Sequence, residues 1–382
     1  MMKKLLCLVA AIAMTFGLFG CGSGNTAAAT IKIGINTEMT GAVASYGTAE
    51  QHGYDLAIKL TNANGGVLGK QIEVVELDNK SDSAESTSVA TRLVSEKVSL
   101  ILGPATTGDV QAELPVCEDS KIPMVTPSAT GETVMMNGDK AYQYAYRTCF
   151  KDSYQGEILS KFVKNNLGMS NVVVLFDNNQ DYTVGVKNSF VSSFQGLGGT
   201  VVDTEVYTSG DTDFASIITA FSGKKYDAIM IAGYYTEAGL IIKQARAQGI
   251  DCPIVGPDGF DSSELGGIAG ADACNNVYFS THYSSLDNSQ AVADFVAAYK
   301  KEYNEEPNAF AALGYDAAML AFDAITRANS TEPEKINAAL ASTTSFSGVT
   351  GTIAINDVHD AVKSGVIVKL TAGVQSEVIH VN

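Results

Sequence analysis

Hydrophobic positions recur with two different periods from residue 31 onward. Short apolar or alternating runs, which predict strands, take turns with longer stretches whose apolar residues lie three or four positions apart, which predict helices. In the first part of the chain the predicted strands are 31–35, 71–77, 99–102 and 123–125, and the predicted helices are 48–62, 84–96 and 109–120. We expect Ser83 to be the N-cap of the helix over 84–96. Strands and helices that alternate at this spacing are typical of a parallel α/β sheet.

The same alternation restarts near residue 154. It predicts helices over 154–165, 182–197, 214–221 and 237–248, and strands over 171–176, 200–207, 228–232 and 254–255. A third block is mainly helical, over 290–303, 309–328 and 333–340, and the chain ends in strand-like stretches at 351–355, 366–370 and 378–381. Because this block holds too few strands for a domain of its own, we expect the chain to cross back to complete the first α/β unit and then to cross again to complete the second.

The predicted fold is therefore α/β, with two doubly wound, Rossmann-like lobes joined by several crossovers as a hinged clamshell. We expect lobe 1 to comprise residues 31–148 and 281–345, and lobe 2 to comprise residues 149–280 and 346–382. Ligands of open α/β sheets bind beyond the carboxyl ends of the strands. Two such lobes that face each other would enclose one cleft.

Small, hydroxyl-rich segments follow three predicted strands of lobe 1, at 40–47, 103–107 and 126–130. Each segment taken alone could be an N-cap or a turn, and either Thr106 or Thr107 could cap the helix that follows. Together they predict a neutral surface of hydroxyl and free N–H groups. Helix N-termini favour an anion at such a place.

Carboxylates and tyrosines follow the predicted strands of lobe 2, in "DNNQDY" (177–182), "GYYTE" (233–237) and "GPDGFD" (256–261). Asp258 could be a simple turn residue beside Gly259. It could also hold a cation, with tyrosines lining an apolar slot. A carboxylate site in one lobe and an ammonium site in the other would suit an amino-acid zwitterion, whose binding would close the cleft.

Composition excludes several function classes. The 382 residues are 46% hydrophobic and 18% charged, with a net charge of -17, so cores can form and no nucleic-acid partner is expected. The "NGGVLGK" segment (64–70) fails as a phosphate loop, because Gln71 replaces the magnesium-binding Ser or Thr. No nucleophile elbow, zinc-protease motif or CxxC pair occurs, and we interpret the four scattered histidines as surface or packing residues. We therefore predict no enzyme, no catalytic residue, no cofactor and no metal site, although Cys252 and Cys274 could pair in an exported protein.

The N-terminus has the features of an export signal. A short basic stretch precedes an apolar run over 5–18 that is too short to span a bilayer, and "LFGC" at 18–21 is similar to a lipobox. We expect residues 1–21 to be a lipoprotein signal peptide with Cys21 as the lipidated residue, and 22–30 to be a linker. Cleavage of an ordinary signal near 27–29 is the alternative.

Five segments in order resemble the periplasmic-type solute-binding proteins of ABC importers for branched-chain amino acids, the Leu/Ile/Val-binding type. They are "IKIGINTEMTGAVASYG", "NANGGVLGKQIEVVELDNKSD", "LILGPATTGDVQAELPVCEDSKIPMVTPSAT", "AGYYTEAGLIIKQARAQG" and "VGPDGF". The resemblance implies a type I periplasmic binding protein clamshell. It also implies an extracytoplasmic location at the cell membrane, an ABC permease as partner, and a monomer.

The resemblance also implies site residues. The ligand carboxylate would meet Thr107, Ser128 and Thr130, the ammonium would pair with Asp258, and aromatic residues would line the cleft, namely Tyr46, Tyr182, Tyr234 (or Tyr235 in its place) and Phe310. Asp258 departs from the family's usual Glu. The expected function is capture of an apolar, branched-chain amino acid for import. A binder or sensor of another small carboxylate or amide, and an exported α/β hydrolase, are the alternatives.

Overall fold

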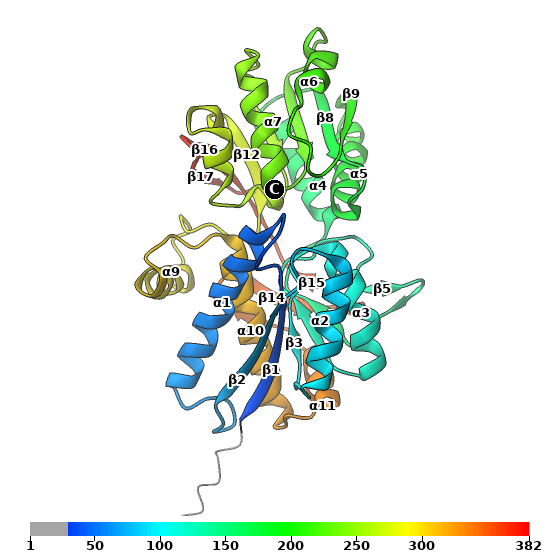
Figure 1. Ribbon diagram of the computed structural model, residues 1–382. Coiled ribbons are helices and arrows are strands. Elements are labelled where there is room, and N and C mark those ends of the chain that lie inside the picture. The colour runs from blue at the N-terminus through cyan, green and yellow to red at the C-terminus, as the bar shows by residue number, and fades with distance from the viewer. Residues whose placement is uncertain (1–29, 382) are drawn as a thin grey trace, which may run out of the picture.

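Lobe 1 is built on a five-stranded parallel sheet. The computed structural model describes residues 30–381. The strands of lobe 1 run in the order β2-β1-β3-β4-β7. They are β1 (Ile31–Thr37), β2 (Ile72–Asp78), β3 (Ile101–Leu102), β4 (Met124–Thr126) and β7 (Ala145–Arg147). A hairpin of β5 (Met136–Asn137) and β6 (Lys140–Ala141) projects beside α3 (Figure 1).

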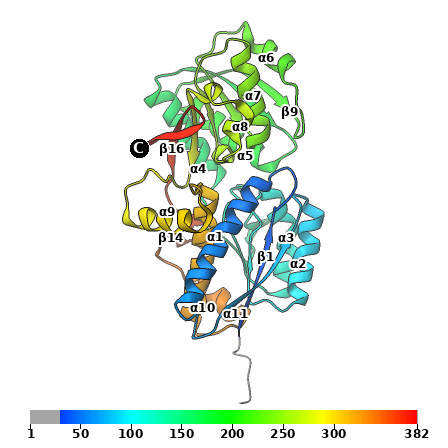
Figure 2. The same cartoon turned by 60° about the vertical axis from the view of Figure 1, so that its left-hand side comes forward.

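Helices cover both faces of this sheet (Figures 1 and 2). One face packs against α1 (Ala44–Ala63), α10 (Ala309–Ala328) and α11 (Pro333–Ala341), with α9 (Gln290–Tyr303) outside α1 and α10. The other packs against α2 (Ser83–Ser95) and α3 (Thr107–Ser120). By length and composition α10 could cross a membrane, but 78% of its most apolar window is buried within the lobe. It is the central core helix of lobe 1.

Lobe 2 holds a seven-stranded sheet in the order β17-β16-β12-β11-β10-β8-β9. Five strands are parallel, β8 (Asn171–Asp177), β9 (Thr200–Tyr207), β10 (Ala228–Ala232), β11 (Ile254–Gly256) and β12 (Val277–Thr281). The edge strands β16 (Val366–Thr371) and β17 (Val374–Ile379) are antiparallel. One face is covered by α4 (Asp152–Lys161), which continues as the π-helical turn η1 (Phe162–Asn166), and by α5 (Asp181–Gly196). The other is covered by α6 (Ala215–Ser222), α7 (Tyr235–Ala247) and α8 (Leu265–Ala269).

The parallel strands of both lobes follow the same doubly wound order, in which the first strand lies between the second and the third. Strand order therefore reverses between β1 and β3 in lobe 1 and between β8 and β10 in lobe 2, the positions at which open α/β sheets bind ligands. The lobes are stacked end to end, with the chain crossing between them (Figure 1). The predicted fold of two doubly wound lobes with several crossovers is confirmed.

The expected boundary at residue 346 is wrong. Residues 346–362 form a small sheet of β13 (Phe346–Gly348), β14 (Gly351–Ile355) and β15 (Ala361–Val362) that does not join the sheet of lobe 2. Ile353, Ile355 and Ala361 are buried in the same core as β1 and α10 of lobe 1. The last crossing therefore lies between β15 and β16, because these side chains find their apolar partners on lobe 1.

Three further expectations need correction or lie outside the described residues. The N-cap of α2 is Asp82, whose side chain accepts from the N–H groups of Ala84 and Glu85, and not Ser83. Cys252 and Cys274 are both free thiols. Cys21, the expected lipidation site, lies outside residues 30–381.

Candidate functional site

A cavity lies where the two lobes meet, with an empty volume of about 260 Å³. Lobe 1 lines it with Tyr46, Ala105, Thr106, Thr107, Ser128 and Phe310, and lobe 2 lines it with Tyr182, Tyr234, Asp258 and Gly259. Seven of the eight predicted ligand-binding residues are therefore brought together. Six of them follow strands whose carboxyl ends meet at this edge, and Phe310 lies at the start of α10. Thr130 is buried close by but is not part of the lining.

The two threonines at the start of α3 have different partners. The hydroxyl of Thr106 accepts from the N–H of Asp109 at 3.3 Å, so Thr106 is the N-cap. The hydroxyl of Thr107 accepts from the N–H of Gly131 at 3.0 Å, which leaves its own proton free to be donated into the cavity. Gly131 permits this contact, since a Cβ there would lie 2.5 Å from Cγ2 of Thr107.

The prediction of a surface of free N–H groups is wrong in one respect. The N–H groups of Ala105 and Thr106 both donate to the carboxyl of Glu38, at 3.0 Å each. Glu38 directly follows β1 and is fully buried. Burial raises its pKa well above the ordinary range, and the nearby carboxylates of Asp109 and Glu50 raise it further. A side chain of the protein thus occupies the two N–H groups nearest the strand end.

Ser128 is joined to a second buried acid. Its Oγ lies 2.5 Å from Oε1 of Glu50 and 2.9 Å from the carbonyl oxygen of Ala105. Burial raises the pKa of Glu50 to about 8. At neutral pH Glu50 is therefore protonated and can donate to Ser128, while Ser128 donates to Ala105. The Ser128 hydroxyl is used within the protein rather than left free for a ligand.

Thr130 presents a hydroxyl without a hydrogen-bond partner among residues 30–381. The residue is 1% exposed. Asp152, whose N–H donates to the Thr130 carbonyl at 3.0 Å, lies beside it, and both of its carboxyl oxygens are also without partners in this part of the chain. Burial raises the pKa of Asp152 well above its usual value. These atoms can still accept or donate hydrogen bonds.

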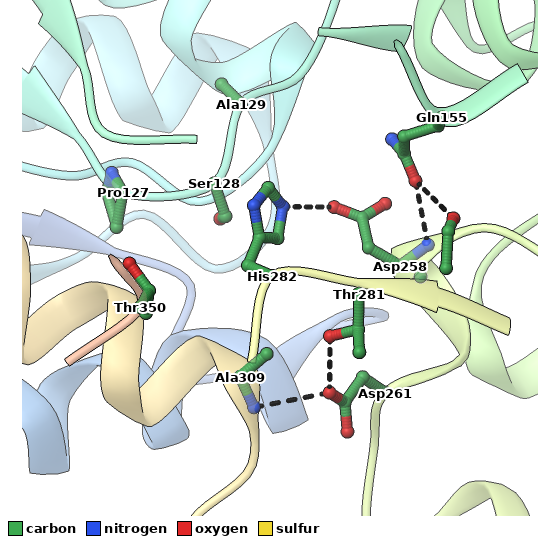
Figure 3. Close-up of polar contacts among 12 residues, drawn as sticks. Pro127, Ser128, Ala129, Gln155, Asp258, Asp261, Thr281, His282, Ala309 and Thr350 are labelled. Carbon is green, nitrogen blue, oxygen red and sulfur yellow. Dashed lines mark hydrogen bonds and ion pairs between the residues drawn. The ribbon is translucent and has the colours of Figure 1, made fainter. Parts of the chain in front are cut away.

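Asp258 is the polar centre of the lobe 2 wall. It opens the short 3-10 helix η2 (Asp258–Phe260) directly after β11 and is 3% exposed. Its Oδ1 accepts from the Tyr182 hydroxyl at 2.6 Å, and its Oδ2 lies 3.1 Å from Nε2 of His282 (Figure 3). Its backbone N–H donates to Oε1 of Gln155 at 2.9 Å. Asp258 is therefore held from three sides, which a simple turn residue would not need.

His282 is a site residue that the sequence reasoning missed. We interpreted it as a surface or packing residue, but its side chain is 1% exposed and contacts Asp258. Burial lowers its pKa to about 4. It directly follows β12, a strand the hydrophobic pattern did not reveal. Recognition of that strand would have placed His282 at the same sheet edge as the other site residues.

Aromatic rings enclose the cavity. The Tyr46 ring stacks on Phe310 with 4.2 Å between centroids, and Tyr182 stacks on Tyr234 at 5.2 Å. The Tyr46 hydroxyl donates to the carbonyl of Gly259 at 2.5 Å and accepts from the N–H of Tyr235 at 3.2 Å, so this lobe 1 residue binds lobe 2 directly. Tyr234, and not Tyr235, lines the cavity.

No cluster of three or more His, Cys, Asp or Glu side chains that could hold a metal ion occurs within residues 30–381. The chemistry of the cavity is instead one hydroxyl on lobe 1 with a free proton, that of Thr107, one doubly hydrogen-bonded carboxylate on lobe 2, and rings between them. An elongated ligand with an anionic end, a cationic end and an apolar part would satisfy this arrangement.

Comparisons with known proteins identify the family of this chain. Residues 30–375 match a family model described as periplasmic binding protein. The solved structure of LivJ, a branched-chain amino acid transporter substrate binding protein from Streptococcus pneumoniae in complex with isoleucine, is 41% identical with a TM-score of 0.88, covering 92% of this chain and 99% of that one. The leucine binding protein LivK from Thermotoga maritima is 37% identical with a TM-score of 0.85 and the same coverage.

A curated relative from Pseudomonas aeruginosa, the leucine-, isoleucine-, valine-, threonine-, and alanine-binding protein, is 30% identical over 341 residues, 89% of this chain and 90% of that protein. The resemblance to the binders of branched-chain amino acids is thereby confirmed, and the chain belongs to the periplasmic binding protein family.

Proposed function

We propose that this protein captures a branched-chain amino acid outside the cytoplasm by closure of its two lobes and delivers it to an ABC importer. The observation that carries the proposal is the cavity itself, with the buried carboxylate of Asp258 on one wall and the free hydroxyl proton of Thr107 on the other. Two relatives named above support this ligand class, since one is named for binding leucine, isoleucine, valine, threonine and alanine and the other was solved in complex with isoleucine.

The lobe 1 wall suits the ligand carboxylate. Thr107 has a hydroxyl proton to donate, and Thr130 has an unpartnered hydroxyl. The positive end of the α3 dipole lies at the same place. Glu38 and Glu50 lie close behind, but burial raises the pKa of each, which favours their uncharged forms and so reduces repulsion of the ligand carboxylate.

The lobe 2 wall suits the ligand ammonium. Tyr182 and His282 each use one lone pair of the Asp258 carboxylate, and one lone pair remains on each oxygen. The carboxylate is buried with only neutral partners at hydrogen-bond distance, so an ammonium group would supply the missing counter-charge. This is the reason to expect an amine on the ligand rather than any small acid.

The rings of Tyr46, Tyr182, Tyr234 and Phe310 form the apolar part of the site. Burial of an aliphatic side chain of leucine size contributes about 1.5–3 kcal/mol. Asp258 is the charged residue of the cavity lining, and the ligand ammonium would neutralise it. No charged group of the lining is left to pair with a charged ligand side chain, which favours leucine, isoleucine or valine.

We further propose that the chain is a monomeric lipoprotein held at the membrane through Cys21. A Cys21→Ser variant should leave the membrane fraction and appear in the soluble fraction with unchanged ligand affinity. A variant that stays membrane-bound after this change would contradict the anchor.

Two alternatives remain testable within one experiment. Thermal-shift measurements would compare all amino acids with 4-methylpentanoate, which lacks the amine of leucine, and leucinamide, which lacks its carboxylate. A bound ligand raises the melting temperature by mass action. We expect shifts with leucine, isoleucine and valine, and losses of most of the shift when either end is removed. An equal shift with 4-methylpentanoate would favour a carboxylate binder or sensor, and conversion of the bound ligand, detected by mass spectrometry, would favour a hydrolase.

A further inference from the structure

His282 is a buried polar side chain that lies behind the cavity lining, against Asp258, and that the proposed function leaves without a role. It lies in the segment by which the chain leaves β12 of lobe 2 for α9 of lobe 1. Its ring stacks on Phe150, with 3.5 Å between centroids and 19° between planes, and Phe150 lies in another crossover, between β7 and α4. One ring nitrogen points at the carboxylate of Asp258, as Figure 3 shows.

We propose that His282 is a positioning residue for ammonium recognition: it holds Oδ2 of Asp258 through its Nε2–H and so ties the ammonium site to the crossover between the lobes. The inference rests on the proposed function, because it assumes that Asp258 receives the ligand amine. It adds a specificity-determining contact that acts through Asp258 and does not touch the ligand.

The geometry around Asp258 requires such a partner. An aspartate carboxylate can rotate about its last bond, and one hydrogen bond to Tyr182 at Oδ1 fixes a single oxygen. The second bond, from His282 to Oδ2, fixes the plane of the carboxylate and thereby the direction of the two lone pairs that remain. Binding groups must be held within roughly 0.5 Å to be effective, and second contacts of this kind hold them.

The ring is suited to this role because it can donate without adding charge. The groups that act on it are Asp258 on η2 and Lys363 on the last crossover, and burial holds its pKa near 4, so it is neutral at physiological pH. Its Nδ1 has no hydrogen-bond partner among residues 30–381, so no acceptor favours a proton there. A neutral donor leaves the full negative charge of Asp258 available for the amine.

A packing role is the competing explanation, since the stacked ring could simply fill space beside Phe150. Two variants separate these roles. His282→Gln keeps an N–H at the position of Nε2 but loses the stacked ring, whereas His282→Leu keeps apolar volume but loses the donor. Phe150→Leu is the matched control, because it removes the stacking partner and leaves the hydrogen bond to Asp258.

The experiment is a double-mutant cycle on the full chain, with leucine affinity measured by calorimetry. A hydrogen bond to a charged group predicts that His282→Leu weakens leucine binding about ten- to a hundredfold, and that His282→Gln restores it to within about threefold of wild type. In the Asp258→Asn background the same His282→Leu change should cost less than about threefold, because the charge it positions is gone. Melting temperatures of the ligand-free variants check that each is folded.

The outcomes are distinct. Equal losses from His282→Leu in both backgrounds, or a failure of His282→Gln to restore binding, would overturn the positioning role and leave a packing role. An Asp258→Asn variant with wild-type leucine affinity would instead overturn the proposed ammonium site, whatever the His282 variants do.

Discussion

Glu50 makes the stability of this protein depend on pH in a direction opposite to that of most acids. Its carboxyl is fully buried behind Ser128, with the Tyr54 hydroxyl 3.4 Å from its second oxygen. Burial raises its pKa from an ordinary 4.5 to about 8. Between these values the native state keeps a proton that the unfolded state releases, so stability is present below pH 4.5 and is lost as pH rises toward 8.

The size of the effect follows from the shift. Each pH unit in this window costs about 1.4 kcal/mol, so raising the pH from 5 to 8 should remove roughly 3–4 kcal/mol of unfolding free energy from this one group. Glu50→Gln should abolish that part, because a glutamine amide has the donor and acceptor of a protonated carboxyl. Its NH₂ can donate to Ser128 as the protonated acid does, so stability at pH 5 should change by less than about 1 kcal/mol.

The assay is urea unfolding at pH 5 and pH 8, followed by calorimetry with leucine at pH 7 and pH 9. Glu113→Gln is the control, because burial also raises the pKa of Glu113 to about 8, but Glu113 bonds to Asn36, whereas Glu50 bonds to the cavity-lining Ser128. Both variants should lose stability more slowly with pH than wild type. Only Glu50→Gln should also remove the weakening of leucine binding above pH 8, where an ionised Glu50 would repel the ligand carboxylate. A Glu50→Gln variant with the full wild-type pH dependence would refute the protonated state assigned here.

Three further predictions concern the cavity wall. Asp258→Asn should weaken leucine binding by roughly 10²- to 10⁴-fold in calorimetry, since breaking a buried ion pair costs about 3–5 kcal/mol, while the ligand-free melting temperature stays the same or rises. A lowered melting temperature with intact binding would contradict this. Thr130→Val should leave ligand-free stability unchanged, because the hydroxyl has no partner among residues 30–381, and should weaken leucine binding about two- to tenfold; a stability loss without a change in affinity would argue against a ligand contact. Gly131→Ala should weaken leucine binding, because the new methyl group would approach Thr107 to 2.5 Å and displace it. The control is Gly196→Ala, whose methyl group would meet nothing within 4 Å and should leave the affinity unchanged. Equal affinities of the two variants would show that Gly131 does not constrain Thr107.

Local sequence patterns predicted the elements and most of the cavity wall for one physical reason. The carboxyl ends of parallel strands meet at one edge of a sheet, so residues that follow predicted strands, such as Thr107, Ser128 and Asp258, had to lie near each other once both lobes faced one cleft. That inference needs no knowledge of which strand pairs with which.

Contacts between segments far apart in the sequence could not be predicted in this way. Nothing in the strand-like pattern at 351–355 says which lobe it joins, because its apolar side chains could pack on either core, and it joins lobe 1. Glu38 accepts from the N–H groups of Ala105 and Thr106, which lie 67 and 68 residues further along the chain. A local hydrophobic pattern cannot predict a contact between segments so far apart. His282 was missed because it follows a strand that the hydrophobic pattern did not reveal.

The two hydrogen bonds of the Tyr46 hydroxyl have a consequence for how affinity is set. Both partners, Gly259 and the N–H of Tyr235, are backbone groups of the opposite lobe, so these bonds form only when the lobes meet. At about 1 kcal/mol each, they change the ratio of closed to open molecules by more than tenfold, and the measured affinity of any ligand that requires closure scales with that ratio. Tyr46→Phe would therefore weaken every ligand by the same factor and leave their rank order unchanged. The strength of capture can thus be adjusted at one hydroxyl group, independently of which solute is chosen.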